Sequence, residues 1–356
     1  MNKFKQIIFT GGGSGGHVVP ALTLINAITE SNSGTNIFYV GGIKSVERKL
    51  VTNAGIRYHA IQTGKLRRYF SLENMIDFFR FSFGILQAFF YLLKFRKKET
   101  LIFSTGGFVG LPLVIAGGFL GFEIYIHEQT SRVGLANKIA SRFASKIFIS
   151  FEESKKFFPE SKTMMTGYPL KESCFTQRDI EYTFEGKVLN LIDRPILLVT
   201  GGGNGAKLLN DFIKNNLNEV KSRYFIIHQV GEKFISEYNE MRSEFYYPVA
   251  FLENLIEVMK HAKIIISRAG AGTVMELMAL QKKSIFIPLK IAQKNEQYHN
   301  AMEASKMLGS IVITEDELKN SSLKSLIELL AQSEGEDSSR QLINGVDQIL
   351  REINYK

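Results

Sequence analysis

Two glycine-rich segments of the chain could bind phosphate groups. Residues 11–16 read Gly-Gly-Gly-Ser-Gly-Gly and precede His17, and residues 201–205 read Gly-Gly-Gly-Asn-Gly. Each segment follows a short apolar run and leads into a helical pattern, from Ala21 and from about Ala206. In such a strand–turn–helix unit, backbone N–H groups at the start of the helix can approach a phosphate closely. Two such units predict two Rossmann-like halves with a ligand in the cleft between them.

Imidazole and carboxylate side chains provide the candidate acid–base groups. His17 stands where the first glycine segment turns into its helix, a position that suits a general base or a diphosphate contact. His127 and Glu128 end the apolar run 124–126, and open α/β sheets bind ligands at the carboxyl ends of their strands. The alternatives are a locally packed His17 and an ordinary solvated loop after the run. Asn137 is a weaker candidate near the start of the next helix.

Residues 267–276, Ser-Arg-Ala-Gly-Ala-Gly-Thr-Val-Met-Glu, form a third candidate segment after an apolar run. Its small residues permit close backbone approach, and Arg268 could neutralise a phosphate. The two carboxylate oxygens of Glu276 suit a pair of sugar hydroxyls, but Thr273 and Glu276 also have the spacing of a helix capping box. The amide-rich residues 293–300, Gln297 among them, could bind sugar hydroxyls or simply begin a surface helix.

The first glycine segment also satisfies the G-x-G-x-x-G pattern of dinucleotide-binding folds. That pattern requires an acid at the end of the second strand to hold the ribose. Here the expected strand 37–40 ends in Gly-Gly-Ile-Lys, without an acid. A nicotinamide-dependent oxidoreductase is therefore disfavoured.

The elements that carry these segments indicate an α/β fold with parallel sheets, because short apolar runs alternate with helical patterns. We predict domains over 1–166 and 167–337, with the polar, irregular residues 171–194 as a connection. Apolar residues at helical spacing predict a terminal amphipathic helix over 338–353. The expected strands are 6–10, 36–40, 58–62, 101–104, 123–127 and 146–149, then 196–200, 224–228, 247–251, 263–267 and 284–287.

Composition narrows the partners and the setting. The 356 residues fit two domains, and 45% hydrophobic content supports packed cores. The net charge of +9 indicates nucleic acid, anionic lipid or a phosphorylated substrate. Nucleic acid is disfavoured because zinc-spaced Cys/His clusters, basic tails and aromatic RNA-binding motifs are missing. A single cysteine, Cys174, excludes an intramolecular disulfide, and the start shows no signal-peptide pattern, so a reducing, cytosolic setting is expected.

Two stretches bear on membrane contact. Residues 100–122 carry no charge, but their glycines and Pro112 favour a strand, a loop and a buried helix over a membrane span. Residues 65–98 are rich in aromatic side chains between basic clusters, which predicts docking on an anionic bilayer rather than only a buried helix. The candidate membrane contacts are Arg67, Arg68, Phe78, Phe79, Phe83, Arg96 and Lys97.

The motifs and their order resemble the MurG family within glycosyltransferase family 28, the UDP-N-acetylglucosamine transferases that act on lipid I. The shared motifs are G-G-x-S/T-G-G-H at 11–17, H-E-Q at 127–129, G-G-x-x-G-A at 201–206, R-x-G-x-x-T-x-x-E at 268–276 and E-Q-Y-x-N-A at 296–301. They cover nearly the whole chain.

The resemblance implies the GT-B fold, two Rossmann-like domains with parallel sheets facing across a cleft and a C-terminal helix, 338–356, packed on the N-terminal domain. It implies inverting transfer from UDP-N-acetylglucosamine to lipid I at the cytoplasmic membrane face, in peptidoglycan synthesis, cell shape and cell division. Other cell-wall synthesis proteins are further candidate partners. Because no metal-binding Asp-x-Asp motif stands out, we expect no obligatory metal or other cofactor.

Carried over by motif, the resemblance assigns the candidate site residues. His17 is the first candidate for the general base, and His127 and Glu128 follow. The implied substrate contacts are Ser14, Gly15, Gly16, Thr130, Asn137, Lys171, Gly203, Asn204, Leu252, Arg268, Ala271, Gly272, Thr273, Val274, Met275, Glu276 and Gln297. Departures from the family pattern are Phe108, Thr130, Tyr168, Lys171 and the pair Gly203 and Asn204. Their effects, the acceptor's peptide stem and the oligomeric state are left open.

Rival interpretations are another GT-B lipid glycosyltransferase of the diacylglycerol type, the oxidoreductase, and a non-catalytic nucleotide-sugar-binding protein.

Overall fold

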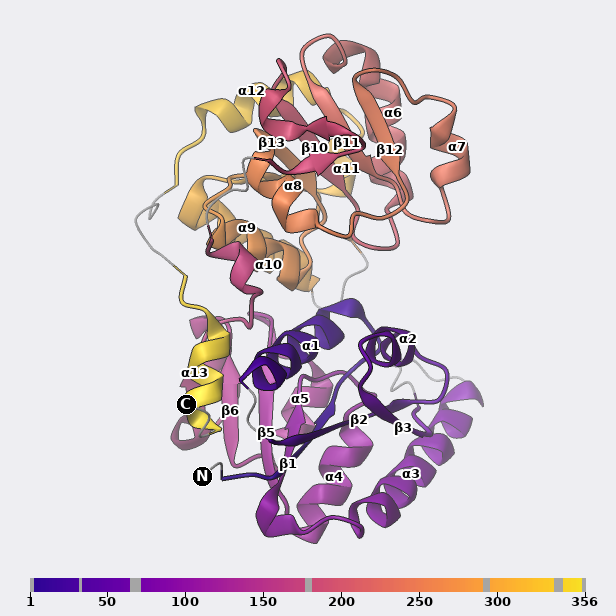
Figure 1. Ribbon diagram of the computed structural model, residues 1–356, viewed down its shortest axis with the longest axis vertical. Coiled ribbons are helices and arrows are strands. Elements are labelled where there is room, and N and C mark those ends of the chain that lie inside the picture. Colours follow the sequence, from indigo (N-terminus) through magenta and orange to yellow (C-terminus); the bar gives the residue numbers. More distant parts are fainter. Residues whose placement is uncertain are drawn as a thin grey trace. The chain divides into compact units, whose positions relative to one another are not determined.

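The chain forms two compact units in a computed structural model (Figure 1). The structure describes residues 3–31, 34–64, 72–176, 181–290, 295–335 and 342–353, with the side chains of 72–76 excepted. Unit 1 comprises Met1–Leu170 and Ile343–Lys356, and unit 2 comprises Lys171–Leu342. The division predicted between 166 and 167 lies within a few residues of this boundary.

Unit 1 is built on a parallel sheet of seven strands in the order β3-β2-β1-β4-β5-β6-β7. Its central strands are continuous apolar runs because both faces of the sheet are buried. The short edge strand β7 was missed by the sequence analysis, since three partly exposed residues carry no strand pattern. The strands are β1 (Gln6–Thr10), β2 (Asn36–Gly42), β3 (Arg57–Ile61), β4 (Thr100–Ser104), β5 (Glu123–Glu128), β6 (Lys146–Ile149) and β7 (Thr163–Met165).

Helices cover both faces of this sheet. One apolar cluster joins the sheet to α3, α4 and α5, and a second joins it to α1 and α13. Helix α1 begins at Gly15 and contains Pro20, so the start predicted at Ala21 is wrong. Two glycines and a proline in the first turns hide this start from sequence patterns. The helices are α1 (Gly15–Glu30), α2 (Val46–Asn53), α3 (Leu72–Leu92), α4 (Leu111–Leu120), α5 (Leu135–Ala140) and α13 (Gly345–Glu352).

The terminal helix α13 is shorter than predicted. Residues 342–344 are not helical, and 336–341 lie outside the described residues. The helix begins at Gly345 because the Asn344 side chain accepts a hydrogen bond from the Val346 N–H at 3.1 Å. The Gly345 N–H also donates to the Tyr168 carbonyl at 3.1 Å. This bond connects the start of α13 to the end of the first segment of unit 1, Met1–Leu170. Helix α13 lies beside α1 (Figure 1), and its apolar residues pack against that helix.

Unit 2 has a parallel sheet of six strands in the order β12-β11-β10-β13-β14-β15. The two-residue strand β15 and the antiparallel β8–β9 hairpin were not predicted, and the hairpin lies within residues 171–194 that we expected to be irregular. The strands are β8 (Thr183–Phe184), β9 (Lys187–Val188), β10 (Ile196–Thr200), β11 (Phe225–Gln229), β12 (Tyr246–Val249), β13 (Ile264–Ser267), β14 (Ile285–Phe286) and β15 (Ile311–Val312). The helices are α6 (Lys207–Val220), α7 (Ile235–Asn239), α8 (Leu255–His261), α9 (Ala271–Ala279), α10 (Glu296–Leu308), α11 (Glu315–Leu318) and α12 (Leu323–Gln332).

Each sheet has a point where the strand order reverses. In unit 1 it lies between β1 and β4, and in unit 2 between β10 and β13. Ligands of open α/β sheets bind at the carboxyl ends of the strands beside such a point. Both glycine segments follow a strand at such a point, so the fold places them where ligands bind.

The uncharged stretch 100–122 forms β4, a loop and the ten-residue helix α4, as predicted. Among the described residues, no helix combines the length and the apolar character needed to span a bilayer.

Candidate active site

His17 is held in one tautomer by its neighbours in unit 1. Its Nδ1 lies 3.0 Å from the Thr105 carbonyl oxygen and 3.3 Å from Oε1 of Gln129. The Gln129 amide is oriented by its own hydrogen bond from Nε2 to the Thr105 carbonyl at 2.6 Å. Both neighbours of Nδ1 are acceptors, so Nδ1 carries the proton and Nε2 keeps a lone pair. A half-buried imidazole with this tautomer can accept a proton from a bound hydroxyl.

The first glycine loop is anchored by a buried carboxylate that the sequence analysis missed. Glu47, in the first turn of α2, accepts hydrogen bonds from the Gly13 N–H at 3.1 Å and the Gly42 N–H at 3.0 Å. Its side chain is fully buried. An acid therefore does lie at the end of the second strand, but both of its carboxylate oxygens accept hydrogen bonds from backbone N–H groups. This geometry does not suit a ribose contact of the dinucleotide-binding kind.

The exposed part of the first loop has free donors. The backbone N–H groups of Gly15 and Gly16 open helix α1 and, in the part of the chain that the structure describes, have no hydrogen-bond partner. Ser14 precedes them with an exposed side chain that caps nothing. Free N–H groups at the start of a 16-residue helix form an anion-binding site.

His127 is packed inside unit 1. Its side chain is fully buried, and Nε2 lies 3.1 Å from the Gly167 carbonyl and 3.3 Å from Ser150 Oγ. Burial lowers the pKa of His127 to about 4. Because the His127 imidazole is buried and its Nε2 bonds to a backbone carbonyl, it cannot contact the hydroxyl group of an acceptor substrate. The geometry therefore argues against His127 as the base.

Glu128 shapes the loop that follows β5. It is 3% exposed and accepts hydrogen bonds from the Thr130 N–H at 3.0 Å, from Thr130 Oγ1 at 2.7 Å and from Asn137 Nδ2 at 2.9 Å. Burial raises the pKa of Glu128, and these hydrogen bonds act in the opposite direction. With its lone pairs used inside the protein, Glu128 is a positioning residue. The structure thus brings together the predicted residues His17, Glu128, Thr130 and Asn137 around the ends of β4 and β5.

The second glycine loop in unit 2 presents its backbone outward. Gly202 has φ +82° and Gly205 has φ +70°, and a Cβ on Gly205 would clash with the Val230 carbonyl. Gly203 and Asn204 are exposed, and their N–H groups have no hydrogen-bond partner among the described residues. They lie just before α6, so this loop also presents free N–H donors that can bind an anion.

Helix α9 begins beside this loop, because β13 pairs with β10 in register Thr200↔Ser267. Its N-cap is Gly270, so Ala271, Gly272 and Thr273 form the first turn. Glu276 is the sixth helical residue, and the capping-box alternative is therefore wrong. The side chains of Val274 and Met275, both predicted substrate contacts, are buried in the core.

Glu276 has a carboxylate suited to a ligand hydroxyl. Burial raises its pKa to about 7, while the positive charge of Lys171 acts in the opposite direction. Its carboxylate has no hydrogen-bond or ion-pair partner within the described ranges. The structure therefore places the predicted residues Lys171 and Glu276 in one electrostatic environment.

Two other predicted contacts are engaged within unit 2. Arg268 Nη1 lies 2.7 Å from Glu315 Oε1 and donates to the Ile287 carbonyl at 3.0 Å. This charge is therefore not a free phosphate ligand in this structure. Gln297 Oε1 accepts the Leu289 N–H at 3.0 Å, which leaves its Nε2 as the group for a ligand.

The predicted contact Leu252 lies beside two residues, Phe251 and Gln229, that were not predicted from the sequence. Leu252 is buried, and its N–H donates to Oε1 of Gln229 at 2.9 Å. Phe251 is 61% exposed and lies close to Gly203. Across the described residues, no three His, Cys, Asp or Glu side chains are grouped to hold a metal ion.

Two parallel-sheet α/β domains in one chain, each with free helix N-termini at its switch point, are the architecture of GT-B glycosyltransferases. Residues 7–149 match the glycosyltransferase family 28 N-terminal domain, and residues 196–352 match the glycosyltransferase family 28 C-terminal domain. The chain belongs to glycosyltransferase family 28, as the sequence motifs indicated.

Two sequence relatives carry the same name. A Clostridium botulinum (strain Langeland) protein is 36% identical over 97% of both chains and is named UDP-N-acetylglucosamine–N-acetylmuramyl-(pentapeptide) pyrophosphoryl-undecaprenol N-acetylglucosamine transferase. A Bacillus cereus protein with this name, numbered 2, is 36% identical over 92% of both chains. The crystal structure of Acinetobacter baumannii MurG superposes with a TM-score of 0.73 at 22% identity, covering 98% of this chain and 99% of that one. This last likeness shows the shared fold.

Proposed function

We propose that this chain transfers N-acetylglucosamine from UDP-N-acetylglucosamine to the muramyl 4-hydroxyl of lipid I, which yields lipid II for peptidoglycan synthesis. The observation that carries this proposal is family 28 membership, with relatives 36% identical over nearly the full length whose names state this transfer. The free N–H groups and the unpaired carboxylate at the two switch points supply chemistry that the transfer needs.

The reaction is a direct displacement. The acceptor hydroxyl oxygen forms a bond to the anomeric carbon, while the bond from that carbon to the diphosphate oxygen breaks and its electron pair leaves with UDP. The hydroxyl proton passes to Nε2 of His17, whose Nδ1 proton is held by Thr105 and Gln129. One displacement inverts the anomeric centre.

Unit 2 holds the donor. The N–H groups of Gly203 and Asn204, in the loop before α6, and those of the first turn of α9 stabilise the charge that develops on the diphosphate. Glu276 accepts hydrogen bonds from the ribose hydroxyls. Phe251 and the Leu252 backbone lie beside the loop and are placed to contact the base.

Unit 1 docks on the membrane through α3. Phe78, Phe79 and Phe83 are 53–66% exposed, whereas the alternate aromatic residues Phe81 and Phe89 pack on the core. Further exposed apolar side chains are Leu86 and Phe90 on α3, Leu93 just after its end, and Phe119 on α4, which packs against α3.

Basic residues border this apolar surface. Arg96, Lys97 and Lys98 are exposed in the segment that follows α3, and the predicted contacts Arg67 and Arg68 lie outside the described residues. Exposed aromatic rings flanked by cations suit the headgroup region of an anionic bilayer. Docking there brings the enzyme to an acceptor whose polyprenyl tail stays in the membrane, at the cytoplasmic face.

We further propose that transfer needs no obligatory metal, because the helix N-termini provide the positive potential at the diphosphate. Full activity in excess chelator is expected, and loss of activity that added Mg²⁺ or Mn²⁺ restores would contradict it.

One assay tests the function. Labelled UDP-sugars are incubated with lipid I, with diacylglycerol and without acceptor. We expect label from UDP-N-acetylglucosamine to appear only in the lipid I product. Transfer to diacylglycerol would support the rival lipid glycosyltransferase, and donor binding without transfer to either acceptor would support a non-catalytic binding protein. Binding of NAD in place of UDP would overturn the proposal.

A further inference from the structure

Gln229 connects three segments of unit 2 through one side-chain amide. Its Nε2 donates to the Gly202 carbonyl at 2.9 Å and to Thr200 Oγ1 at 3.2 Å. Its Oε1 accepts the Leu252 N–H at 2.9 Å. The end of β10, the second glycine loop and the loop after β12 are thus joined by a residue that is 1% exposed.

These bonds leave the glycine loop little freedom on its inner side. The Gly202 carbonyl accepts from Gln229 and also from the Gly205 N–H at 2.9 Å, so both of its lone pairs are used. The Gly202 N–H donates to Thr200 Oγ1 at 3.2 Å. With the inner groups paired, the exposed N–H groups of the loop are the ones that remain for a ligand.

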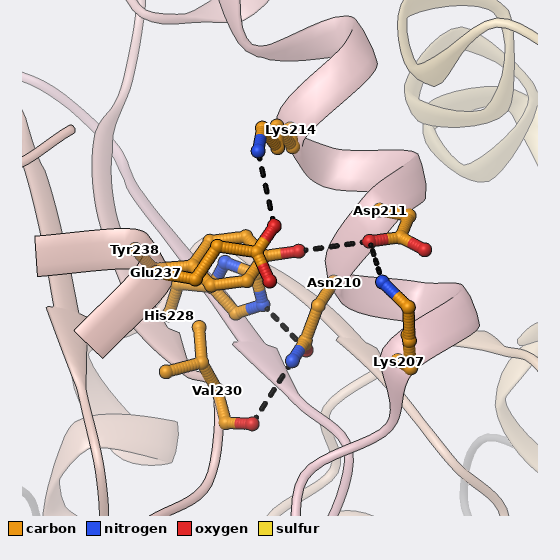
Figure 2. A network of polar contacts seen from close by, with 8 residues as sticks. All are labelled: Lys207, Asn210, Asp211, Lys214, His228, Val230, Glu237 and Tyr238. Carbon is orange, nitrogen blue, oxygen red and sulfur yellow. Dashed lines mark hydrogen bonds and ion pairs between the residues drawn. The ribbon is translucent and has the colours of Figure 1, made fainter. Parts of the chain in front are cut away.

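The preceding residue, His228, supports a different element. It is fully buried and bonds to Asn210 Oδ1 at 3.1 Å and to the Tyr246 hydroxyl at 2.9 Å. Figure 2 shows Asn210 between His228 and the Val230 carbonyl, which it reaches at 2.9 Å. Because side chains alternate along a strand, His228 faces helix α6, while Gln229 serves the loops. The two neighbours therefore allow a matched comparison.

We propose that Gln229 is a positioning residue for nucleotide binding, and that it holds the second glycine loop and the Leu252 backbone in the geometry that UDP requires. This inference rests on the proposed donor and deepens it. Gln229 touches no ligand group itself. Its amide determines which backbone groups point outward, so the loop binds without having to be ordered first.

The substitution Gln229→Glu separates the role of this side chain as a hydrogen-bond donor from its role as an acceptor. Glutamate keeps an acceptor for the Leu252 N–H but replaces the donor by an oxygen that faces the Gly202 carbonyl. We expect the Kd for UDP, measured by calorimetry at pH 8, to rise by about tenfold or more.

His228→Leu is the matched control. It removes a buried polar side chain from the same strand and should lower the melting temperature, while the Kd for UDP stays within about twofold of wild type. A Gln229→Glu protein that melts lower but binds UDP like wild type at pH 8 would overturn the inference.

The outcome for Gln229 can be distinguished from that of the proposed function. If the wild-type chain binds UDP but fails to use lipid I, the acceptor assignment fails and the Gln229 test still applies. If the wild-type chain does not bind UDP, the donor assignment itself is overturned, and the inference with it.

Discussion

His17 gains its proposed role from a single hydrogen-bonding arrangement. Because two acceptors face Nδ1, the lone pair on Nε2 is available without a change of tautomer. We expect His17→Ala to lower kcat by about 10²- to 10⁴-fold, with donor binding and melting temperature little changed. Steady-state kinetics on lipid I, together with UDP calorimetry, measure this. A loss confined to donor affinity would instead make His17 a phosphate contact.

Glu276 should make donor binding depend on pH near neutrality. Burial raises its pKa to about 7, so the carboxylate is ionised above that pH and protonated below it. Only the ionised form offers both oxygens as acceptors to the ribose. The KM for UDP-N-acetylglucosamine should rise as pH falls from 8 to 6, measured with acceptor saturating.

The variant Glu276→Gln is the control for this dependence. It should raise KM by about ten- to 150-fold, equivalent to roughly 1.5–3 kcal/mol, and should remove the pH dependence between 6 and 8. A KM like that of wild type, with only reduced thermal stability, would mean that Glu276 has a purely structural role.

Motifs predicted the candidate residues for contact with substrate, but not the residues that hold them in place. His17 and Glu276 stand at recognisable spacings next to glycine loops. Glu47 and Gln229 act through partners 34 and 23 residues away along the chain, so no local pattern marks them. The reverse holds for His127, whose motif position suggested chemistry, while the fold buries it against Gly167.

At the scale of elements, α3 divides its aromatic residues between core and solvent. Replacing Phe78, Phe79 and Phe83 by serine should weaken binding to anionic vesicles by about tenfold or more, since each exposed ring loses its burial in the headgroup region. Activity on vesicle-embedded lipid I should fall by more than activity on a soluble short-chain analogue. Co-sedimentation and paired assays measure both effects.

A matched control changes an exposed apolar residue elsewhere. Leu191 is 78% exposed in unit 2, and Leu191→Ser should leave vesicle binding unchanged. Equal losses of the triple variant on both acceptors, with a lowered melting temperature, would show that the three rings belong to the core. Vesicle binding that persists at wild-type strength would also contradict docking through α3.

Hydrophobic patterns predicted the strands that are buried on both faces. They failed where the bounds of an element depend on contacts with distant residues, or where the element is very short. The central strands β1, β4 and β10 are continuous apolar runs and were located to within a residue. The start of α13 depends on the Asn344 cap together with the contact of Gly345 with Tyr168, far away in sequence. Strands as short as β15 contain too few residues for a pattern.

At the scale of the whole molecule, each unit buries a histidine that the proposed chemistry does not use. Burial lowers the pKa of His127 to about 4 in unit 1 and that of His228 to about 3 in unit 2. The ordinary value, near 6.5, applies to the unfolded chain. A depressed folded pKa contributes stability above pH 6.5 that is lost as pH falls towards the folded pKa. Glu276, whose folded pKa is raised, contributes stability at low pH that is lost as pH rises through about 7.

Because these contributions oppose each other, the pH dependence of the wild-type unfolding free energy does not separate them. Variants of each residue measure its contribution individually. From pH 7 to pH 5 the His228 contribution should decrease by about 2 kcal/mol, because the unfolded imidazole takes up a proton that the folded one does not. The difference in unfolding free energy between wild type and His228→Leu should therefore shrink by about that amount over this range. For Glu276→Gln the difference should change in the opposite direction. Urea unfolding at several pH values measures both differences, and a His228→Leu difference that is independent of pH would show that this histidine titrates alike in the folded and unfolded chain.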